Sequence, residues 1–384
     1  MKFIAVVTPL VLLAAACSPP AADTQSSAPV VQMAEATRAE MDRVNASRFT
    51  TPMPAQAPDP TERLQPAAAP TPAPPPAGES PTATTPASTV SYDAGLVRIQ
   101  VLLDRAHFSP GVIDGYDGEN VRKAVSAYQH ANNLPVNGLA DDALLTRLEQ
   151  ADSSPALVAY VLTSEDVSGP FVDVPQDLEA MSRLERVGYE SAAEAIAEKF
   201  HMDEDLLRTL NPSVDFATAG TEIVVANGGG ELSATVASVQ VDIDEGAVRA
   251  FDASNQLVAY YPATIGSGDA PAPVGEHTVR GVAFDPTYRY DPARLPTFGR
   301  RSHGAVDIAA GPNNPVGAVW IALSAETYGI HGAANPAQVS KTQSHGCIRL
   351  TNWDATELGR AVSVGVPVTI QEGSGLAARE SGRG

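Results

Sequence analysis

The segment Ser344-His345-Gly346-Cys347-Ile348-Arg349 lies a short distance after Ile330-His331-Gly332, so that one cysteine and two histidines occur close together near the C-terminus. A thiol has a pKa of about 8.5 and attacks a carbonyl at neutral pH only when an imidazole or a positive charge favours the thiolate. His331 and His345 are the candidate imidazoles, and a glycine follows each. Glycine lets the backbone turn sharply and lets N–H groups approach an oxyanion. The pattern predicts a thiol nucleophile with a histidine base.

Around this segment the sequence has the short alternating runs that are typical of β-strands. One helix interrupts them, which is predicted to be capped by Asn352 and to end before Gly365. The sequence therefore predicts a mainly antiparallel β domain with one or two helices over residues 234–371, followed by a disordered tail over residues 372–384. The clearest runs are 236–241, 248–251, 257–260 and 366–370.

Three further segments extend the pattern beyond the cysteine and the histidines. Together they resemble the L,D-transpeptidase (YkuD-type) catalytic domain, roughly from Ala234 to Ile370. The sequence departs from the family pattern at Ala333, where threonine is usual, and at Ser340, where glycine is common. The matching segments are Pro271-Ala272-Pro273-Val274-Gly275, Gly311-Pro312-Asn313-Asn314-Pro315-Val316-Gly317 and Tyr328-Gly329-Ile330.

The resemblance implies a catalytic role for four residues. Cys347 is the nucleophile, which attacks the amide after the third residue of a peptidoglycan stem peptide, expels the terminal D-alanine and becomes a thioester. His331 is the base, held in its working tautomer by a backbone carbonyl, that of Gly332. The backbone N–H groups of Gly346 and Cys347 donate to the oxyanion.

The same resemblance implies supporting roles for three neighbouring residues. Ser344 and His345 shape the loop before the nucleophile, and His345 can also polarise the thiolate. Arg349 pairs with a carboxylate of the acidic stem peptide. On spacing alone, an internal salt bridge that positions the loop is an equal alternative for Arg349. An amine of a second stem or of a protein lysine completes the transfer, whereas water would make the protein a carboxypeptidase or hydrolase.

Neither a metal nor an organic cofactor is expected. The interval between His331 and Ser344 does not match the close ligand spacing of common zinc motifs, and no Gly-rich phosphate loop follows a strand. The formal net charge of −20 argues against nucleic acid and anionic headgroups as partners.

The N-terminus has the organisation of a signal peptide, with a charged start, a short apolar run and small residues leading into Cys17. No segment approaches the ~20 apolar residues that a membrane-spanning helix needs. Residues 1–17 resemble a bacterial lipoprotein signal in which Cys17 is acylated, and an ordinary cut near Ala16 is the alternative. Ser18 resembles the signal for outer-membrane sorting. We therefore expect export to the periplasm of a Gram-negative bacterium, with the lipid as the membrane contact.

Residues 18–91 are rich in Ala, Pro, Ser and Thr, which predicts a disordered tether. Val30 to Val44 is the exception, because its apolar residues fall near helical spacing. A short marginal helix and a fluctuating segment are the alternatives there.

Residues 92–150 carry three helical patterns separated by the glycine turns Val112-Ile113-Asp114-Gly115 and Pro135-Val136-Asn137-Gly138. With Val121-Arg122-Lys123-Ala124-Val125 and Tyr128-Gln129, these turns resemble the small three-helix peptidoglycan-binding module. A helical spacer is the alternative, but it explains the periodicity and not the turns.

Residues 151–183 are predicted to be a linker, and residues 184–226 a βααβ unit. Its first strand is expected at Leu184-Glu185-Arg186-Val187, and a closing strand is expected at 221–225. This order resembles a LysM-type glycan-binding unit. A purely structural packing module is an equal alternative.

Taken together, the resemblances imply a peptidoglycan L,D-transpeptidase whose partners are stem peptides and glycan of the cell wall. A papain-like peptidase is disfavoured, because its catalytic histidine follows the cysteine and this chain has no histidine after His345. Two alternatives remain open. One is an L,D-carboxypeptidase or wall hydrolase that uses the same thiol, and the other is a catalytically silent protein that anchors to peptidoglycan.

Overall fold

The computed structural model describes residues 30–49, 92–268, 270–293, 302, 304–342 and 346–373. The predicted signal peptide with Cys17, the loop residues Ser344 and His345, and most of the predicted tether and tail lie outside the described residues.

The β-rich region forms a sheet that has nine strands within the described residues, in the order β5-β4-β3-β13-β7-β10-β11-β12-β6. Neighbouring strands are antiparallel except for two parallel pairs, β13 with β3 and β11 with β12. The prediction of a mainly antiparallel domain is therefore confirmed. The strands are β3 (Ser238–Asp242), β4 (Ala247–Phe251), β5 (Leu257–Pro262), β6 (Thr264–Ile265), β7 (Gly275–Phe284), β10 (Val319–Leu323), β11 (Gly329–His331), β12 (Ile348–Arg349) and β13 (Pro367–Gln371).

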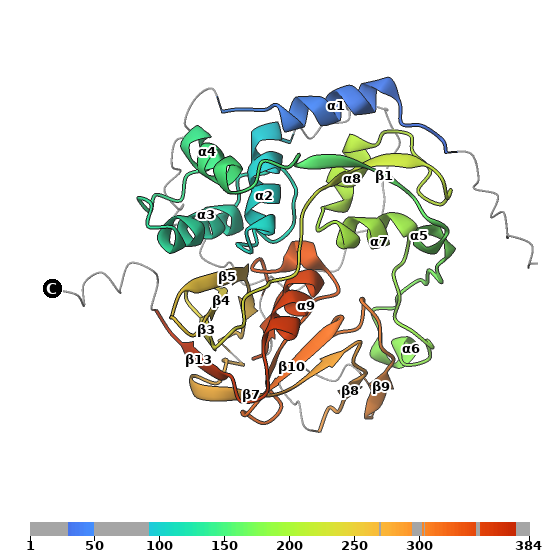
Figure 1. The fold of residues 1–384 in the computed structure, drawn as a ribbon. Helices are drawn as coiled ribbons and strands as arrows, with labels where there is room; N and C mark the ends of the chain where they lie inside the picture. The colour runs from blue at the N-terminus through green and yellow to red at the C-terminus, as the bar shows by residue number, and fades with distance from the viewer. Residues whose placement is uncertain are drawn as a thin grey trace, which may run out of the picture.

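Helix α9 (Asn352–Ala361) packs against this sheet beside β10 and β11 (Figure 1). Its apolar side chains, such as Leu358, are fully buried with Ile321 of β10 in the core of the domain. The predicted helix cap is wrong by one residue. Thr351 caps the helix, because its hydroxyl accepts a hydrogen bond from the Asp354 N–H at 3.1 Å. Asn352 lies in the first turn, and its amide bonds to other parts of the molecule.

Residues 92–150, all of which are described, form three helices as predicted: α2 (Ala94–Arg105), α3 (Glu119–Ala131) and α4 (Asp142–Ala151). A buried glutamine holds each glycine turn. The Gln100 carbonyl accepts hydrogen bonds from the N–H groups of Asp114 and Gly115 at 3.2 and 2.7 Å. Gln129 holds the second turn in the same way, through the N–H groups of 137 and 138 at 2.9 and 3.0 Å. The glutamine of the Tyr-Gln pair is therefore a turn-fixing residue.

This three-helix domain packs directly on the sheet at β5. The backbone of Tyr260 in β5 exchanges hydrogen bonds with the segment after α2, donating to His107 and accepting from Ser109, both at 2.9 Å. The fully buried ring of Tyr260 belongs to the same apolar cluster as Phe108 and Tyr128. The three-helix domain is therefore packed directly against the nine-stranded sheet.

The βααβ order is present, but its first strand is not where the sequence predicts it. The closing strand β2 (Glu222–Ala226) pairs antiparallel with β1 (Leu157–Val161), and helices α7 (Ala192–Lys199) and α8 (Glu204–Leu210) lie between them. Residues 184–187 are described and contain no strand. Val187 is fully buried there, and its N–H donates to the Ala310 carbonyl at 2.9 Å.

The predicted linker over residues 151–183 is also wrong, since it contains β1 and the short helices α5 (Ser164–Ser168) and α6 (Leu178–Met181). Local alternation cannot choose between two candidate strands when the partner lies far along the chain. The more apolar run Leu157-Val158-Ala159-Tyr160-Val161 takes the pairing with β2. Helix α6 packs near a second two-stranded sheet, β8 (Tyr288–Tyr290) and β9 (Val306–Ile308).

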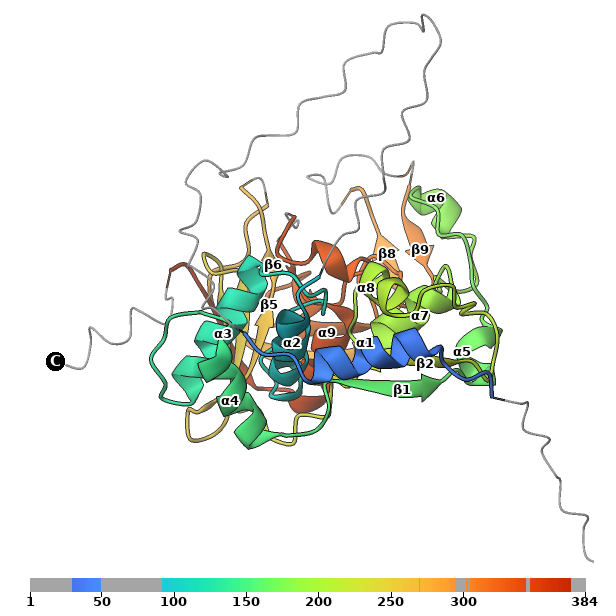
Figure 2. The ribbon, with the colours of Figure 1, turned by 90° about the horizontal axis from the view of Figure 1, so that it is seen from above.

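Part of the predicted tether is ordered, since residues 35–45 form α1 (Glu35–Asn45). Figure 2 shows α1 lying across α2 and the βααβ unit. Val44 is fully buried, and the Asn45 side chain exchanges two hydrogen bonds with the backbone of Leu157, at 2.8 and 2.9 Å. An isolated helix of this length is marginal in water. Tertiary packing therefore stabilises it, which the periodicity alone could not show.

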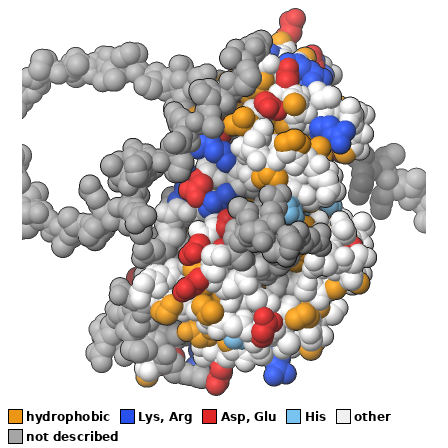
Figure 3. All heavy atoms as spheres, turned by 90° about the vertical axis from the view of Figure 1, so that its left-hand side faces the viewer, with side chains coloured by type: hydrophobic (Ala, Val, Ile, Leu, Met, Phe, Trp, Pro, Cys, Tyr) orange, Lys and Arg blue, Asp and Glu red, His pale blue; other side chains and the backbone are white. Residues whose placement is uncertain are grey.

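Among the described helices, none is both long enough and apolar enough to cross a membrane. On the face shown in Figure 3, acidic and basic side chains are interspersed, without a basic patch among the atoms that are coloured.

Candidate active site

Strand β11 carries the predicted base, and the neighbouring strand β12 begins directly after the predicted nucleophile. The strands are parallel neighbours, with Ile330 opposite Ile348 and His331 opposite Arg349. Opposite residues in a sheet point to the same face, and successive residues alternate. Ile330 and Ile348 are buried in the core. His331 and Arg349 therefore point to the opposite face, and Cys347 lies in the bend immediately before β12.

His331 is held in one tautomer. Its Nδ1 lies 2.7 Å from the Gly332 carbonyl, which is the contact that the family resemblance implies. A carbonyl only accepts, so Nδ1 carries the proton and Nε2 carries the lone pair that a base needs. The side chain is 3% exposed and stacks on Trp320 of β10, with ring centroids 5.5 Å apart.

The surroundings keep both reacting groups neutral. Burial, aided by the positive charge of Arg349, lowers the pKa of His331 to about 4, despite the carbonyls of Gly332 and Val316 that favour the protonated ring. Burial raises the pKa of the Cys347 thiol, against a backbone hydrogen bond with Gly329 and the charge of Arg349. At neutral pH these shifts favour the neutral imidazole of His331 and the protonated thiol of Cys347.

Cys347 is a partly exposed thiol that follows a glycine in a left-handed conformation. Gly346 has φ = 103°, and a Cβ there would lie 2.7 Å from the Tyr328 ring. Only glycine fits this position without displacing the ring. The backbone that leads into Cys347 therefore depends on this residue.

The loop between His331 and Cys347 is tied to β6. Ser340 has φ = 67°, which explains why glycine suits this position in the family pattern. Its N–H donates to the Thr264 hydroxyl at 2.8 Å, and its own hydroxyl donates to the Ala263 carbonyl at 3.2 Å. These bonds hold serine in the left-handed conformation. The other departure, Ala333, is a small side chain buried in the same loop.

Asn352 is a supporting residue whose role the sequence analysis missed, because it was interpreted as a helix cap. Its carbonyl accepts from the Ala318 N–H at 2.8 Å. Its NH₂ group donates to Glu198 Oε1 at 2.8 Å and to the Pro312 carbonyl at 3.1 Å. A Cβ on Gly332 would lie 2.1 Å from Asn352 Oδ1, so the amide packs directly on the residue that holds His331.

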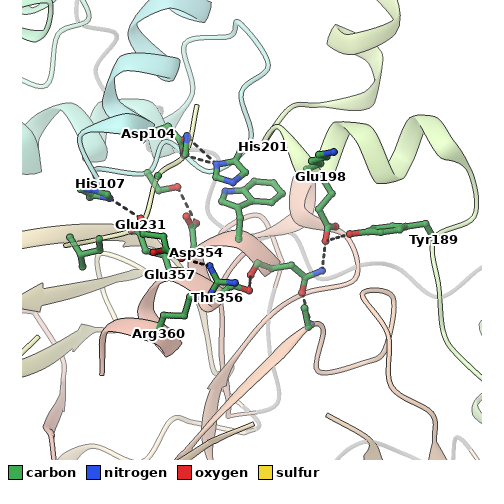
Figure 4. A pocket seen from close by; sticks show the side chains of 18 residues that line it. Asp104, His107, Tyr189, Glu198, His201, Glu231, Asp354, Thr356, Glu357 and Arg360 are labelled. Atoms are coloured by element: carbon green, nitrogen blue, oxygen red, sulfur yellow. Dashed lines mark hydrogen bonds and ion pairs between the residues drawn. The ribbon is translucent and has the colours of Figure 1, made fainter. Parts of the chain in front are cut away.

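Two cavities lie beside the site, and Cys347 is not among the described residues that line either. The cavity in Figure 4 has a volume of about 610 Å³ and lies where the three-helix domain, the βααβ unit and α9 meet. In it, His201 pairs with Asp104 at 2.9 Å, and His107 pairs with Glu357 at 2.7 Å. The second cavity, of about 740 Å³, lies between the βααβ unit and the loop 334–337. Glu198 lies in the wall of both.

The described residues contain no group of three or more His, Cys, Asp or Glu side chains that could hold a metal ion. Ser344 and His345 lie outside the described residues.

Comparison with known proteins agrees with this geometry. Residues 237–370 match the YkuD family, an L,D-transpeptidase catalytic domain, and residues 93–148 match the family "Putative peptidoglycan binding domain". The "Putative L,D-transpeptidase YkuD" of Bacillus subtilis is 29% identical over 178 residues, covering 46% of this chain and 91% of that protein. The "Probable L,D-transpeptidase 3" of Mycobacterium tuberculosis is 30% identical over 172 residues, covering 42% and 57%.

Solved structures of L,D-transpeptidases are similar at low identity. The enzyme from Xylanimonas cellulosilytica is 15% identical, with a TM-score of 0.32, and the match covers 77% of this chain and 100% of that one. L,D-transpeptidase 3 from Mycobacterium tuberculosis is 16% identical, with a TM-score of 0.29, covering 39% and 73%. On the family matches, the chain contains a YkuD L,D-transpeptidase catalytic domain and a helical peptidoglycan-binding domain.

Proposed function

We propose that this protein is a peptidoglycan L,D-transpeptidase that uses Cys347 as its nucleophile and His331 as its base. The observation that carries the proposal is the parallel pairing of β11 with β12, which sets His331 opposite Arg349, two residues after Cys347. The Nδ1 hydrogen bond to Gly332 leaves Nε2 as the basic nitrogen. The similarity to L,D-transpeptidases supplies the substrate class.

In the first half of the reaction, His331 takes the thiol proton as the sulphur attacks the carbonyl carbon of the third stem residue, in the amide that joins this residue to the terminal D-alanine. A bond forms between sulphur and carbon, and the carbonyl oxygen becomes an oxyanion. The N–H groups of Gly346 and Cys347 are the proposed donors to it. The oxyanion then collapses, the C–N bond breaks, and His331 returns the proton to the departing amine of D-alanine. The product is a thioester.

In the second half, an amine attacks the thioester. His331 takes a proton from the amine, an amide forms, and the sulphur leaves and recovers a proton. An amine of a second stem gives a 3→3 crosslink, and a protein lysine gives a protein attached to the wall. Water in place of the amine gives a trimmed tripeptide, which is the carboxypeptidase alternative.

Three residues close to Cys347 in the sequence complete the proposed site. Arg349 binds a carboxylate of the stem peptide, which its place beside His331 in the sheet supports. Its charge also favours the thiolate that forms during attack. Ser344 and His345 are proposed to shape the loop ahead of the nucleophile.

We further propose that the protein works in the periplasm, with Cys17 lipidated and inserted in the outer membrane. The peptidoglycan-binding domain supports a position at the wall. The LysM-like βααβ unit is proposed to bind glycan, with structural packing as the alternative. Mass spectrometry of the protein extracted from cell envelopes tests the lipidation, since a mature N-terminal peptide without acyl chains would contradict it.

The experiment that tests the reaction is intact-protein mass spectrometry after incubation with a disaccharide-tetrapeptide, with analysis of the products in the same sample. We expect a thioester adduct, released D-alanine and a crosslinked dimer. Cys347→Ala is the matched control and should give none of these while still sedimenting with purified sacculi. A thioester adduct with tripeptide as the sole product would establish carboxypeptidase activity. A folded protein that gives neither adduct nor product would overturn the proposal and favour a protein that anchors to peptidoglycan without catalysis.

A further inference from the structure

Glu198 joins the βααβ unit to the catalytic domain through hydrogen bonds. It lies near the end of α7, where it is 9% exposed. Its Oε1 accepts from the Asn352 NH₂ group at 2.8 Å and from the Tyr189 hydroxyl at 3.2 Å. Figure 4 shows Glu198 and Tyr189 pointing toward each other at the edge of the cavity. A side chain outside the catalytic domain thus contacts the first turn of α9.

The Asn352 amide has only one orientation that satisfies its neighbours. Ala318 presents an N–H to it, whereas Pro312 presents a carbonyl and Glu198 a carboxyl oxygen. The amide oxygen must therefore face Ala318, and both N–H bonds must face the two acceptors. With Glu198 in place, the two amide protons and the amide oxygen all have partners, so the side chain is fixed.

The fixed amide supports the turn that holds the catalytic base. Asn352 Oδ1 occupies the space that a Cβ would take on Gly332 and on Gly317, at 2.1 and 2.2 Å. Gly332 provides the carbonyl that accepts from His331 Nδ1 at 2.7 Å. A displaced amide would therefore displace this carbonyl and the imidazole with it.

We propose that Glu198 is a positioning residue for catalysis: through Asn352 it holds the Gly332 carbonyl that fixes the tautomer and direction of His331. The inference rests on the proposed function for its catalytic consequence, and on the hydrogen bonds alone for the positioning. It makes the βααβ unit a part of the catalytic apparatus, whether or not that unit binds glycan.

Residue 198 must accept the hydrogen bond from Asn352, and it does not need to carry a charge. Burial raises the pKa of Glu198 to about 7, and the charge of Glu194 also raises this pKa. The hydrogen bonds from Asn352 and Tyr189 and the charge of His201 act in the opposite direction. Both protonation states keep an oxygen that accepts from Asn352. A glutamine would do the same, which gives a conservative variant.

The test compares Glu198→Ala and Glu198→Gln in the full chain, using two readouts. The first is the rate at which iodoacetamide alkylates Cys347. Peptide mapping separates this product from alkylated Cys17. His331→Ala serves as the reference protein that lacks the proposed base. The second is the ¹⁵N NMR signal of the Nδ1-protonated imidazole, assigned by its loss in His331→Ala. We expect Glu198→Ala to slow alkylation and thioester formation about 10- to 100-fold and to weaken that signal. Glu198→Gln should stay within about twofold of the unmodified protein.

The steady-state constants separate positioning from a loss of substrate binding. Because Glu198 touches no substrate in this proposal, kcat should fall with KM unchanged in Glu198→Ala. Glu204→Ala is the matched control, since it removes a carboxylate from the same unit, where it pairs with Arg208 on the surface. It should change neither readout.

A second pair of variants decides the matter if Glu198→Ala does not fold. Asn352→Asp keeps the acceptor for Ala318 but turns an oxygen toward Glu198, and it should slow alkylation to a similar extent. Adding Glu198→Gln supplies a donor to that oxygen but none to the Pro312 carbonyl, so the double variant should recover part of the rate. Normal alkylation in a folded Glu198→Ala protein, or no recovery in the double variant, would overturn the inference. If the tetrapeptide gives no thioester while Glu198→Ala still slows alkylation, the proposed function fails and the positioning stands.

Discussion

In the proposed active site, burial favours the uncharged forms of both the His331 imidazole and the Cys347 thiol. Burial and the charge of Arg349 lower the pKa of His331 to about 4, so the ring stays a free base throughout the neutral range. Thioester formation should therefore hold its rate from about pH 7 down to about pH 5 and fall only as the pH approaches 4. Rapid-quench mass spectrometry over this pH range measures the rate of thioester formation. A rate that is already halved near pH 6.5 would mean that His331 titrates like an ordinary histidine.

Gly346 allows a second prediction at this scale. Gly346→Ala should abolish thioester formation, because the new Cβ would meet the Tyr328 ring at 2.7 Å and alanine resists φ = 103°. Gly281→Ala is the matched control, since a Cβ there has no neighbour within 4 Å. Thermal melting of both variants shows whether the loss is local. If a folded Gly346→Ala protein formed the thioester at the wild-type rate, glycine would not be required before Cys347.

At the scale of elements, the ordered helix α1 depends on a few contacts with the rest of the protein. Asn45→Ala removes both hydrogen bonds to the backbone of Leu157 and should lower the free energy of unfolding by about 1–3 kcal/mol. Hydrogen exchange at α1 should rise in the same variant. Asp42→Ala, at an exposed position of the same helix, should change the stability little. If Asn45→Ala matched Asp42→Ala in both measurements, α1 would not be docked through this contact.

The elements also show how far the sequence could predict the fold. Local signals were sufficient for the three helices of residues 92–150 and for the alternating strands, because a short stretch of chain encodes them. They were insufficient for β1, since pairing with β2 is decided by a partner far along the chain. The contact of His331 with Gly332 could be expected from the family resemblance. Trp320 and Glu198 reach the site through tertiary packing, and nothing in their sequence neighbourhood signals it.

In the whole molecule, the three-helix domain, the βααβ unit and the catalytic domain meet around one cavity (Figure 4). Two histidine–carboxylate pairs connect them. His201 of the βααβ unit pairs with Asp104 of the three-helix domain, and its ring stacks on Trp353 of α9 at 4.9 Å. His107, which follows α2 in the three-helix domain, pairs with Glu357 of α9. The relative placement of the domains is therefore coupled to protonation at this junction.

This coupling predicts how stability depends on pH. Burial lowers the pKa of His107, but the hydrogen bond and the charge of Glu357 outweigh it, so the pKa is raised overall. The folded protein therefore binds this proton more tightly than the unfolded chain, and the stabilisation is present at low pH and is lost as the pH rises through the raised pKa. His107→Asn should lower the free energy of unfolding by about 1 kcal/mol near pH 6 and by less near pH 9. Asparagine suits the left-handed backbone at this position, where φ = 65°. Urea denaturation at the two pH values measures the difference, with His277→Asn on β7, outside the junction, as the control. An equal loss at both pH values would show that His107 stabilises the junction by packing alone.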